Sequence, residues 1–78
     1  MTSDEPLILY TRAGCHLCEI AAAMLEAAGL DWRPADIEGD PGLERVYGVR
    51  VPVLKRSDTG EELDFPFGGE ELARFAAQ

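Results

Sequence analysis

Residues 7–10 (Leu-Ile-Leu-Tyr) form a continuous apolar run that follows Pro6 and precedes a polar loop. A strand with one face in water alternates apolar and polar residues, whereas a strand inside a parallel sheet is apolar throughout. The run therefore predicts a strand that is buried on both faces. A chain of 78 residues has room for one domain, so we expect residues 1–78 to form a single unit around this strand.

The next segment, residues 15–28, is rich in alanine, leucine and glutamate, and its apolar residues recur at helical spacing. Gly14 before this segment permits a sharp turn. Gly29 after it occupies the position where a helix often ends in glycine. The first third of the chain is therefore predicted to run from a strand through a glycine turn into a helix.

The rest of the chain carries shorter signals for the remaining elements. Pro34 favours the edge of a sheet for the second strand, and Asp40 followed by Pro41 is typical of the start of a helix. In chain order, the predicted elements are a strand at 30–37, a short helix at 41–47, strands at 51–55 and 61–65 that form a hairpin, and a helix at 70–77. The order β-α-β-α-β-β-α predicts a parallel pair extended by antiparallel strands.

Acidic residues outnumber basic ones by 15 to 7, which gives a formal net charge of -8. Nucleic acids and anionic membranes bind surfaces that are rich in lysine and arginine, so we expect neither as a partner. No apolar stretch approaches the roughly 18 residues that span a bilayer. Residues 1–6 lack the basic and apolar regions of a secretory signal. These features predict a cytoplasmic protein.

Both cysteines of the chain, Cys15 and Cys18, lie in one tetrapeptide at the start of the predicted helix. A bridge around four residues stabilises a protein by only about 2 kcal/mol, against about 4.7 kcal/mol for a 100-residue loop. Redox chemistry therefore explains the pair better than structural stabilisation does. Residues three apart on a helix are close enough for a disulfide. The helix N-terminus favours a thiolate at Cys15, and Cys18 lies one turn deeper, so we expect a nucleophile and a resolving thiol.

Two other interpretations of this tetrapeptide stay open. One is a binding module in which the thiols are vestigial and the fold only presents a surface to a partner. The other is a metal site at Cys15, His16 and Cys18. Zinc takes four ligands and the sequence offers no second cluster, so we expect no metal.

The segment from residue 7 to residue 18 (Leu-Ile-Leu-Tyr-Thr-Arg-Ala-Gly-Cys-His-Leu-Cys) resembles the active-site segment of glutaredoxins, in particular the short glutaredoxin-like proteins of bacteria. Val51-Pro52 falls where the thioredoxin-like superfamily has its cis-proline. Gly68-Gly69 falls where glutaredoxins have two glycines before their last helix. The resemblance covers nearly the whole chain and implies an α/β fold of the thioredoxin-like, glutaredoxin type, with helices flanking a four-stranded mixed sheet.

The resemblance also implies an activity and a set of site residues. It implies thiol–disulfide exchange at Cys15 and Cys18, without a prosthetic cofactor, on disulfides of proteins or small thiols. Glutathione or a reductase would recycle the protein. The residues expected to contact substrate or glutathione are Arg12, His16, Arg50, Val51, Pro52, Gly68 and Gly69.

The chain departs from the family pattern at several positions. The usual Cys-Pro-Tyr-Cys is Cys-His-Leu-Cys here, and Arg50 replaces the common threonine before Val-Pro. Glu70 and Glu71 follow the glycine pair, where the family binds a glutathione carboxylate, and two acids there should weaken that binding. The choice between glutathione and a reductase therefore stays open. Arg12 and Arg50 either hold an anionic substrate or balance nearby acids.

Overall fold

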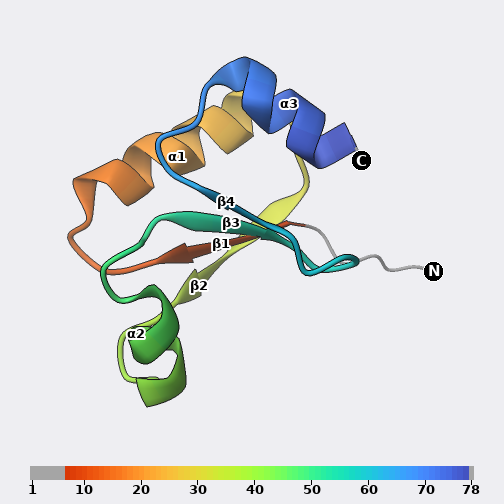
Figure 1. The fold of residues 1–78 in the computed structure, drawn as a ribbon. Helices are drawn as coiled ribbons and strands as arrows, with labels where there is room; N and C mark the ends of the chain where they lie inside the picture. The colour runs from red at the N-terminus through yellow and green to blue at the C-terminus, as the bar shows by residue number, and fades with distance from the viewer. Residues whose placement is uncertain (1–6, 78) are drawn as a thin grey trace.

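The computed structural model describes residues 7–77. Residues 1–6, which entered the argument about a secretory signal, and residue 78 lie outside the described part. Within it the elements follow the predicted order (Figure 1). They are β1 (Leu7–Thr11), α1 (His16–Ala27), β2 (Trp32–Asp36), α2 (Pro41–Tyr47), β3 (Val53–Arg56), β4 (Glu62–Asp64) and α3 (Gly69–Ala77).

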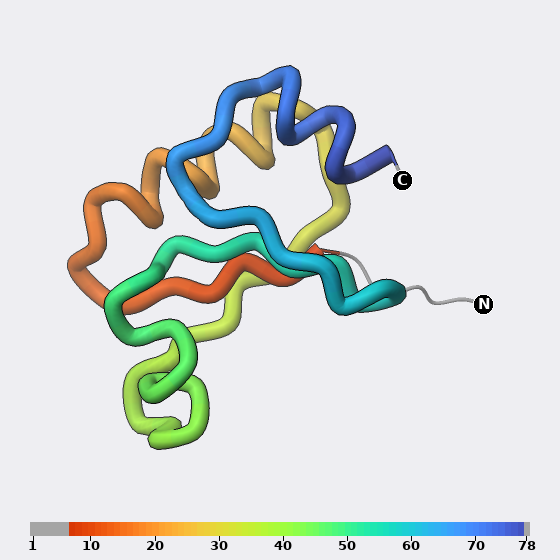
Figure 2. Tube along the Cα trace, in the orientation of Figure 1, coloured from red at the N-terminus to blue at the C-terminus, as the bar shows by residue number. Residues whose placement is uncertain are grey.

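The four strands form one mixed sheet in the order β2-β1-β3-β4. β1 pairs in parallel with β2 and antiparallel with β3, and β3 pairs antiparallel with β4. α1 and α3 cover one face of this sheet and α2 lies against the other (Figures 1 and 2). The predicted α/β class, the mixed sheet and the edge position of β2 are confirmed.

The apolar run of β1 supplies side chains to two separate cores. Successive side chains of a strand point to opposite faces, so Leu7 and Leu9 pack with α1 and α3 while Ile8 and Tyr10 pack with α2. The first core contains Leu7, Leu9, Ala21, Leu25, Leu54, Phe67, Leu72 and Phe75, and the second contains Tyr10, Ile37, Tyr47 and Val53. Burial on both faces explains why this strand has no polar residue before its last position.

Pro34 lies in β2 without costing a backbone hydrogen bond. At the two ends of the pairing with β1, the N–H of Leu7 donates to Asp31 O (3.1 Å) and the N–H of Ile37 donates to Thr11 O (3.0 Å). Backbone groups alternate between the two sides of a strand. The odd-numbered residues of β2 therefore face β1, and the even-numbered ones, including Pro34, face outward. The missing N–H falls on the open edge of the sheet.

The helix starts follow local signals and the strand ends do not. Asp40 is the N-cap of α2, and its Oδ1 accepts the N–H groups of Gly42 (3.1 Å) and Leu43 (3.2 Å), as the sequence predicted. β3 begins at Val53, two residues later than predicted. The N–H of Val51 donates instead to the end of α2, and Pro52 has no N–H to give to a ladder.

Across residues 7–77, no helix has the length and apolar character that crossing a bilayer requires.

Arg56 joins the hairpin to the last helix from a buried position. Its Nη1 donates to the backbone oxygens of Phe75 (2.8 Å) and Ala76 (3.1 Å), which lie at the end of α3. Its Nη2 and Nε donate to the carboxylate of Asp58 (2.6 and 3.0 Å). The guanidinium thus binds carbonyl groups that a helix end leaves without partners, and it places α3 on the sheet.

Truncating a core leucine should cost far more than truncating an exposed valine. Leu54 is fully buried in the first core, so Leu54→Ala should lower the free energy of unfolding by about 2–5 kcal/mol. Val49 is fully exposed, and Val49→Ala should leave stability nearly unchanged. Urea denaturation followed by circular dichroism measures both. Equal losses in the two variants would contradict this core assignment.

Candidate functional site

Cys15 and Cys18 form a disulfide at the N-terminus of α1, with their Cα atoms 5.2 Å apart. Gly14, with a φ of 76°, turns the chain out of β1 and into the helix. Cys15 is the N-cap residue, and its Sγ accepts the N–H of Cys18 at 3.1 Å. The sulfur takes the place of the side-chain oxygen of an ordinary N-cap. The same N–H is therefore in position to stabilise a thiolate on Cys15.

The two sulfurs differ in their access to solvent. Cys18 is only 5% exposed, whereas Cys15 is partly exposed at the end of the helix. A bulky molecule in solution would therefore reach Cys15 before Cys18. His16 extends from the first turn with a side chain that is 81% exposed, and its Nδ1 lies 3.9 Å from Glu19 Oε1. It borders the disulfide without packing into the protein.

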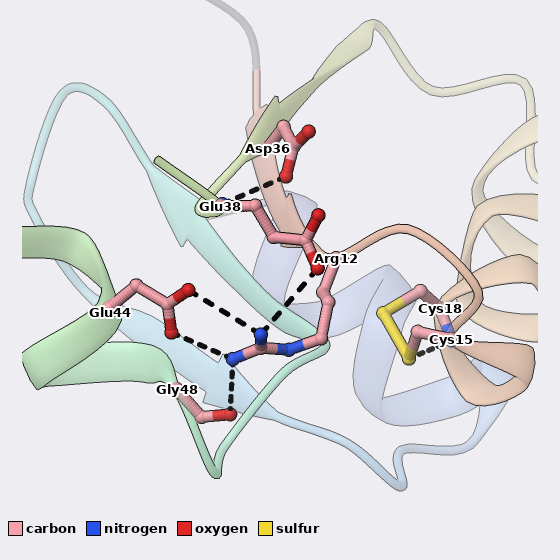
Figure 3. A network of polar contacts seen from close by, with 7 residues as sticks. All are labelled: Arg12, Cys15, Cys18, Asp36, Glu38, Glu44 and Gly48. Carbon is pink, nitrogen blue, oxygen red and sulfur yellow. Dashed lines mark hydrogen bonds and ion pairs between the residues drawn. A yellow bond between two sulfur atoms is a disulfide. The ribbon is translucent and has the colours of Figure 1, made fainter. Parts of the chain in front are cut away.

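Arg12 points away from the disulfide and into a cluster of acids (Figure 3). Its Nη2 donates to Glu44 Oε1 at 2.9 Å and to the backbone oxygen of Gly48 at 3.0 Å, and its Nη1 lies 3.7 Å from Glu38 Oε2. The hydrogen bond to Glu44 raises the pKa of the guanidinium. Of the two alternatives from the sequence, the geometry favours the balancing of acids. The contact with Gly48 also ties the β1–α1 loop to the α2–β3 loop.

Arg50 holds the α2–β3 loop from its other side. Its Nη2 donates to Glu62 Oε1 and to Asp64 Oδ1, both at 2.8 Å, and its guanidinium lies 5.3 Å from the centroid of the Tyr47 ring. The Tyr47 hydroxyl donates to Glu62 Oε2 at 2.6 Å, and its ring stacks on Tyr10 with centroids 4.2 Å apart. Hydrogen bonds from Tyr47 and Arg50 lower the pKa of Glu62, so this carboxylate stays charged.

The α2–β3 loop held by these arginines carries Val51 and Pro52. The peptide bond between them is cis, and Pro52 is fully buried. The N–H groups of Arg50 and Val51 both donate to Tyr47 O, at 2.9 and 3.0 Å. This segment is therefore fixed by the end of α2 as well as by its flanking side chains.

Gly68 and Gly69 lie exposed at the start of α3. The Gly68 N–H donates to Glu71 Oε1 at 3.0 Å, so a carboxylate of the chain itself already binds this end of the helix. A Cβ atom added at either glycine would meet nothing within 4 Å. Packing within the chain therefore does not explain why both positions are glycine.

A hollow of about 280 Å³ opens between α1 and β2, beside the disulfide. Leu9 of β1, Cys18 of α1, and Trp32 and Pro34 of β2 line it. The sequence analysis did not include Trp32 or Pro34 among the site residues. The parallel pairing that it predicted was a signal for them, because this pairing places Pro34 opposite Leu9, next to the first turn of the helix.

The described residues offer no arrangement for a metal ion. Within 7–77, no group of three or more histidine, cysteine, aspartate or glutamate side chains is placed to hold one. His16 turns toward Glu19, and the two cysteines are bonded to each other.

Comparisons with known proteins agree with this fold. The model of the glutaredoxin-like domain family (DUF836) matches residues 6–75. The chain is 42% identical to the target protein XcR50 from X. campestris, whose X-ray structure superposes with a TM-score of 0.82 over 92% of this chain and 97% of that one. It is 30% identical to protein Ne2328 from Nitrosomonas europaea, whose solution structure gives a TM-score of 0.78 over 97% and 98% of the two chains. No match was found among curated proteins.

Removing the Arg12 side chain should loosen the α2–β3 loop. Arg12→Ala deletes the hydrogen bond to Gly48 O, so the backbone amides of Arg50 and Val51 should exchange their hydrogens faster. Hydrogen exchange followed by NMR measures this effect. Arg74→Ala, which removes an equal charge from the exposed face of α3, is the matched control and should leave these amides unchanged. Unaltered exchange in Arg12→Ala would show that the loop holds its place without this contact.

Proposed function

This chain belongs to the glutaredoxin-like domain family (DUF836), and from this premise we propose that it is a thiol–disulfide oxidoreductase that works through Cys15 and Cys18. One observation supports the proposal above the others. A partly exposed sulfur caps the start of α1 and is bonded to a buried sulfur one turn further along the helix. This arrangement gives one sulfur to the substrate and keeps the other for the second step.

The exchange takes two steps. In the reduced protein the Cys15 thiolate attacks one sulfur of a substrate disulfide; a new bond forms between these sulfurs, and the other substrate sulfur leaves as a thiolate that takes up a proton. Cys18 then loses its proton and attacks Cys15 Sγ, which breaks the mixed disulfide and releases the second substrate thiol. The substrate gains two electrons and two protons. The protein is left with the Cys15–Cys18 disulfide.

The separation of roles follows from position. Cys18 is nearly inaccessible, so it competes little for external disulfides. It is close to Cys15 along the helix, with 5.2 Å between the Cα atoms, so the second attack is intramolecular and fast compared with attack by a free thiol. The N–H of Cys18 stabilises the negative charge on Cys15 Sγ in the first step. In the second step it keeps the same acceptor, Cys15 Sγ.

The surface around Cys15 is the proposed substrate site. We place the substrate backbone along Val51, which the buried Pro52 supports, because two arginines hold this loop in one conformation beside the β1–α1 loop. Gly68 and Gly69 are proposed contacts because packing inside the chain does not require glycine at either position. His16 would meet the substrate from the first turn of α1, while Arg12 and Arg50 act as positioning residues.

Replacing each cysteine with serine should separate the two steps. Cys15→Ser should abolish catalysis of the reduction of insulin or of a mixed disulfide by dithiothreitol and leave only the uncatalysed rate, because the nucleophile is lost. Cys18→Ser should accumulate the mixed disulfide with substrate, which mass spectrometry detects as an added mass that dithiothreitol removes. Full activity of Cys15→Ser would overturn the proposal. Inactivity of the unmodified protein on every disulfide would favour the binding-module interpretation.

The reductant that recycles the protein is proposed to be a dithiol protein rather than glutathione. The N-terminus of a helix attracts anions, and in α3 the carboxylate of Glu71 already accepts the N–H of Gly68. A glutathione carboxylate at this place would have to displace Glu71 and would also face Glu70. Both acids therefore oppose its binding.

Removing the two acids should raise the use of glutathione. Each charge near a helix terminus is worth about 0.3–1 kcal/mol, so Glu70→Gln with Glu71→Gln should increase glutathione-dependent kcat/KM by several-fold, while turnover with dithiothreitol stays constant. Glu61→Gln, at the hairpin turn, is the control for the change in net charge. If the double variant shows no gain in glutathione-dependent kcat/KM, then either glutathione binds elsewhere or the two acids do not oppose its binding.

A further inference from the structure

The hollow between α1 and β2 has apolar walls that reach the disulfide. Leu9 is fully buried at its base, and Ala22, Trp32 and Pro34 line its sides. Both bonded cysteines also line it, so a group in the hollow lies next to the reacting sulfurs. Its volume of about 280 Å³ suits one large side chain, and it is open to solvent.

The charge that the hollow presents is negative. Its lining contains two charged residues, Arg12 and Glu19. The guanidinium of Arg12 contacts Glu44 and Glu38, and these two carboxylates offset its positive charge (Figure 3). Glu19 has a side chain that is 75% exposed and a loose contact of 3.9 Å with His16. A carboxylate thus stands at the rim of an apolar hollow and is open to a cation.

Trp32 adds a second feature that favours a cation. Its Nε1–H donates to Glu26 Oε2 at 3.0 Å, which fixes the indole and places another carboxylate at its edge. The faces of indole rings attract ammonium and guanidinium groups. Lysine and arginine lay their methylene stems along apolar surface and keep the charged end in water. An acidic side chain would be repelled by Glu19, and a wholly apolar one would gain nothing from this carboxylate.

We propose that the hollow is a subsite for a lysine or arginine side chain of the substrate protein, close in sequence to the cystine that Cys15 attacks. The stem of this side chain lies against Trp32 and Pro34, and its charge faces Glu19. The inference rests on the proposed function and names its substrate class, a basic protein that contains a cystine. The net charge of -8 also attracts such a partner over a longer range.

Peptide substrates test the subsite directly. Three peptides would carry one cysteine in a mixed disulfide with thionitrobenzoate, a chromophore, and would differ only in the neighbouring residue, which is arginine, norleucine or glutamate. An exposed ion pair and a cation–π contact each add a modest preference for a cation. Release of the chromophore by the reduced protein should therefore be about three- to tenfold faster, as kcat/KM, for arginine than for norleucine, and slowest for glutamate.

Variants then locate the preference. Glu19→Gln should reduce the arginine-over-norleucine ratio by about two- to fivefold, and Trp32→Leu should reduce it as well. Glu61→Gln removes an equal charge at the far hairpin turn and should leave the ratio unchanged. The Glu19 side chain lies in solvent, so its replacement should not disturb folding.

The outcomes separate this inference from the function on which it rests. If all three peptides react at the same rate, the subsite is overturned while the oxidoreductase proposal stands. An arginine preference that persists in Glu19→Gln and Trp32→Leu would also overturn it, because the preference would then come from net charge and not from the hollow. If no peptide is reduced, both proposals fail.

Discussion

The structure depends on the burial of β1 on both of its faces. Leu9 packs under α1 and α3 while Tyr10 packs against α2, so the two cores are built from opposite sides of one strand. Because β1 lies inside the sheet, its position also determines where the chain leaves the sheet. The chain leaves the sheet after Thr11, and Gly14 turns it into the helix that Cys15 caps. The place of the disulfide is thus set by the hydrophobic packing of a strand that contains neither cysteine.

Arginines supply long-range contacts that a small core cannot. Arg12 reaches an acid 32 residues away and the carbonyl group of Gly48, Arg50 reaches two acids on the hairpin, and Arg56 binds the end of α3. In each case one guanidinium joins two segments that lie far apart in the chain. The fork of donors on an arginine suits this role better than the single ammonium of a lysine. In this acidic protein, Arg12, Arg50 and Arg56 are therefore used in the structure, whereas Arg33, Arg45 and Arg74 lie exposed.

Sequence reasoning succeeded where the determining signal is local. The order of elements, the Asp40 cap, the edge position of the strand with Pro34 and the mixed sheet all followed from short patterns. It could not choose between ligand binding and acid pairing for Arg12 and Arg50, because their partners lie far away along the chain. The hollow could not be predicted for the same reason. Its walls come from β1, α1 and β2, which lie side by side only after the chain has folded.

The outward-facing Pro34 has a consequence for what happens at the open edge of the sheet. A foreign strand that tried to join β2 would find a donor at Trp32 and at Asp36 but none between them, so it could not build a continuous ladder. The gap at Pro34 thus works against the stacking of foreign strands, or of further copies of this chain, along the open edge of the sheet.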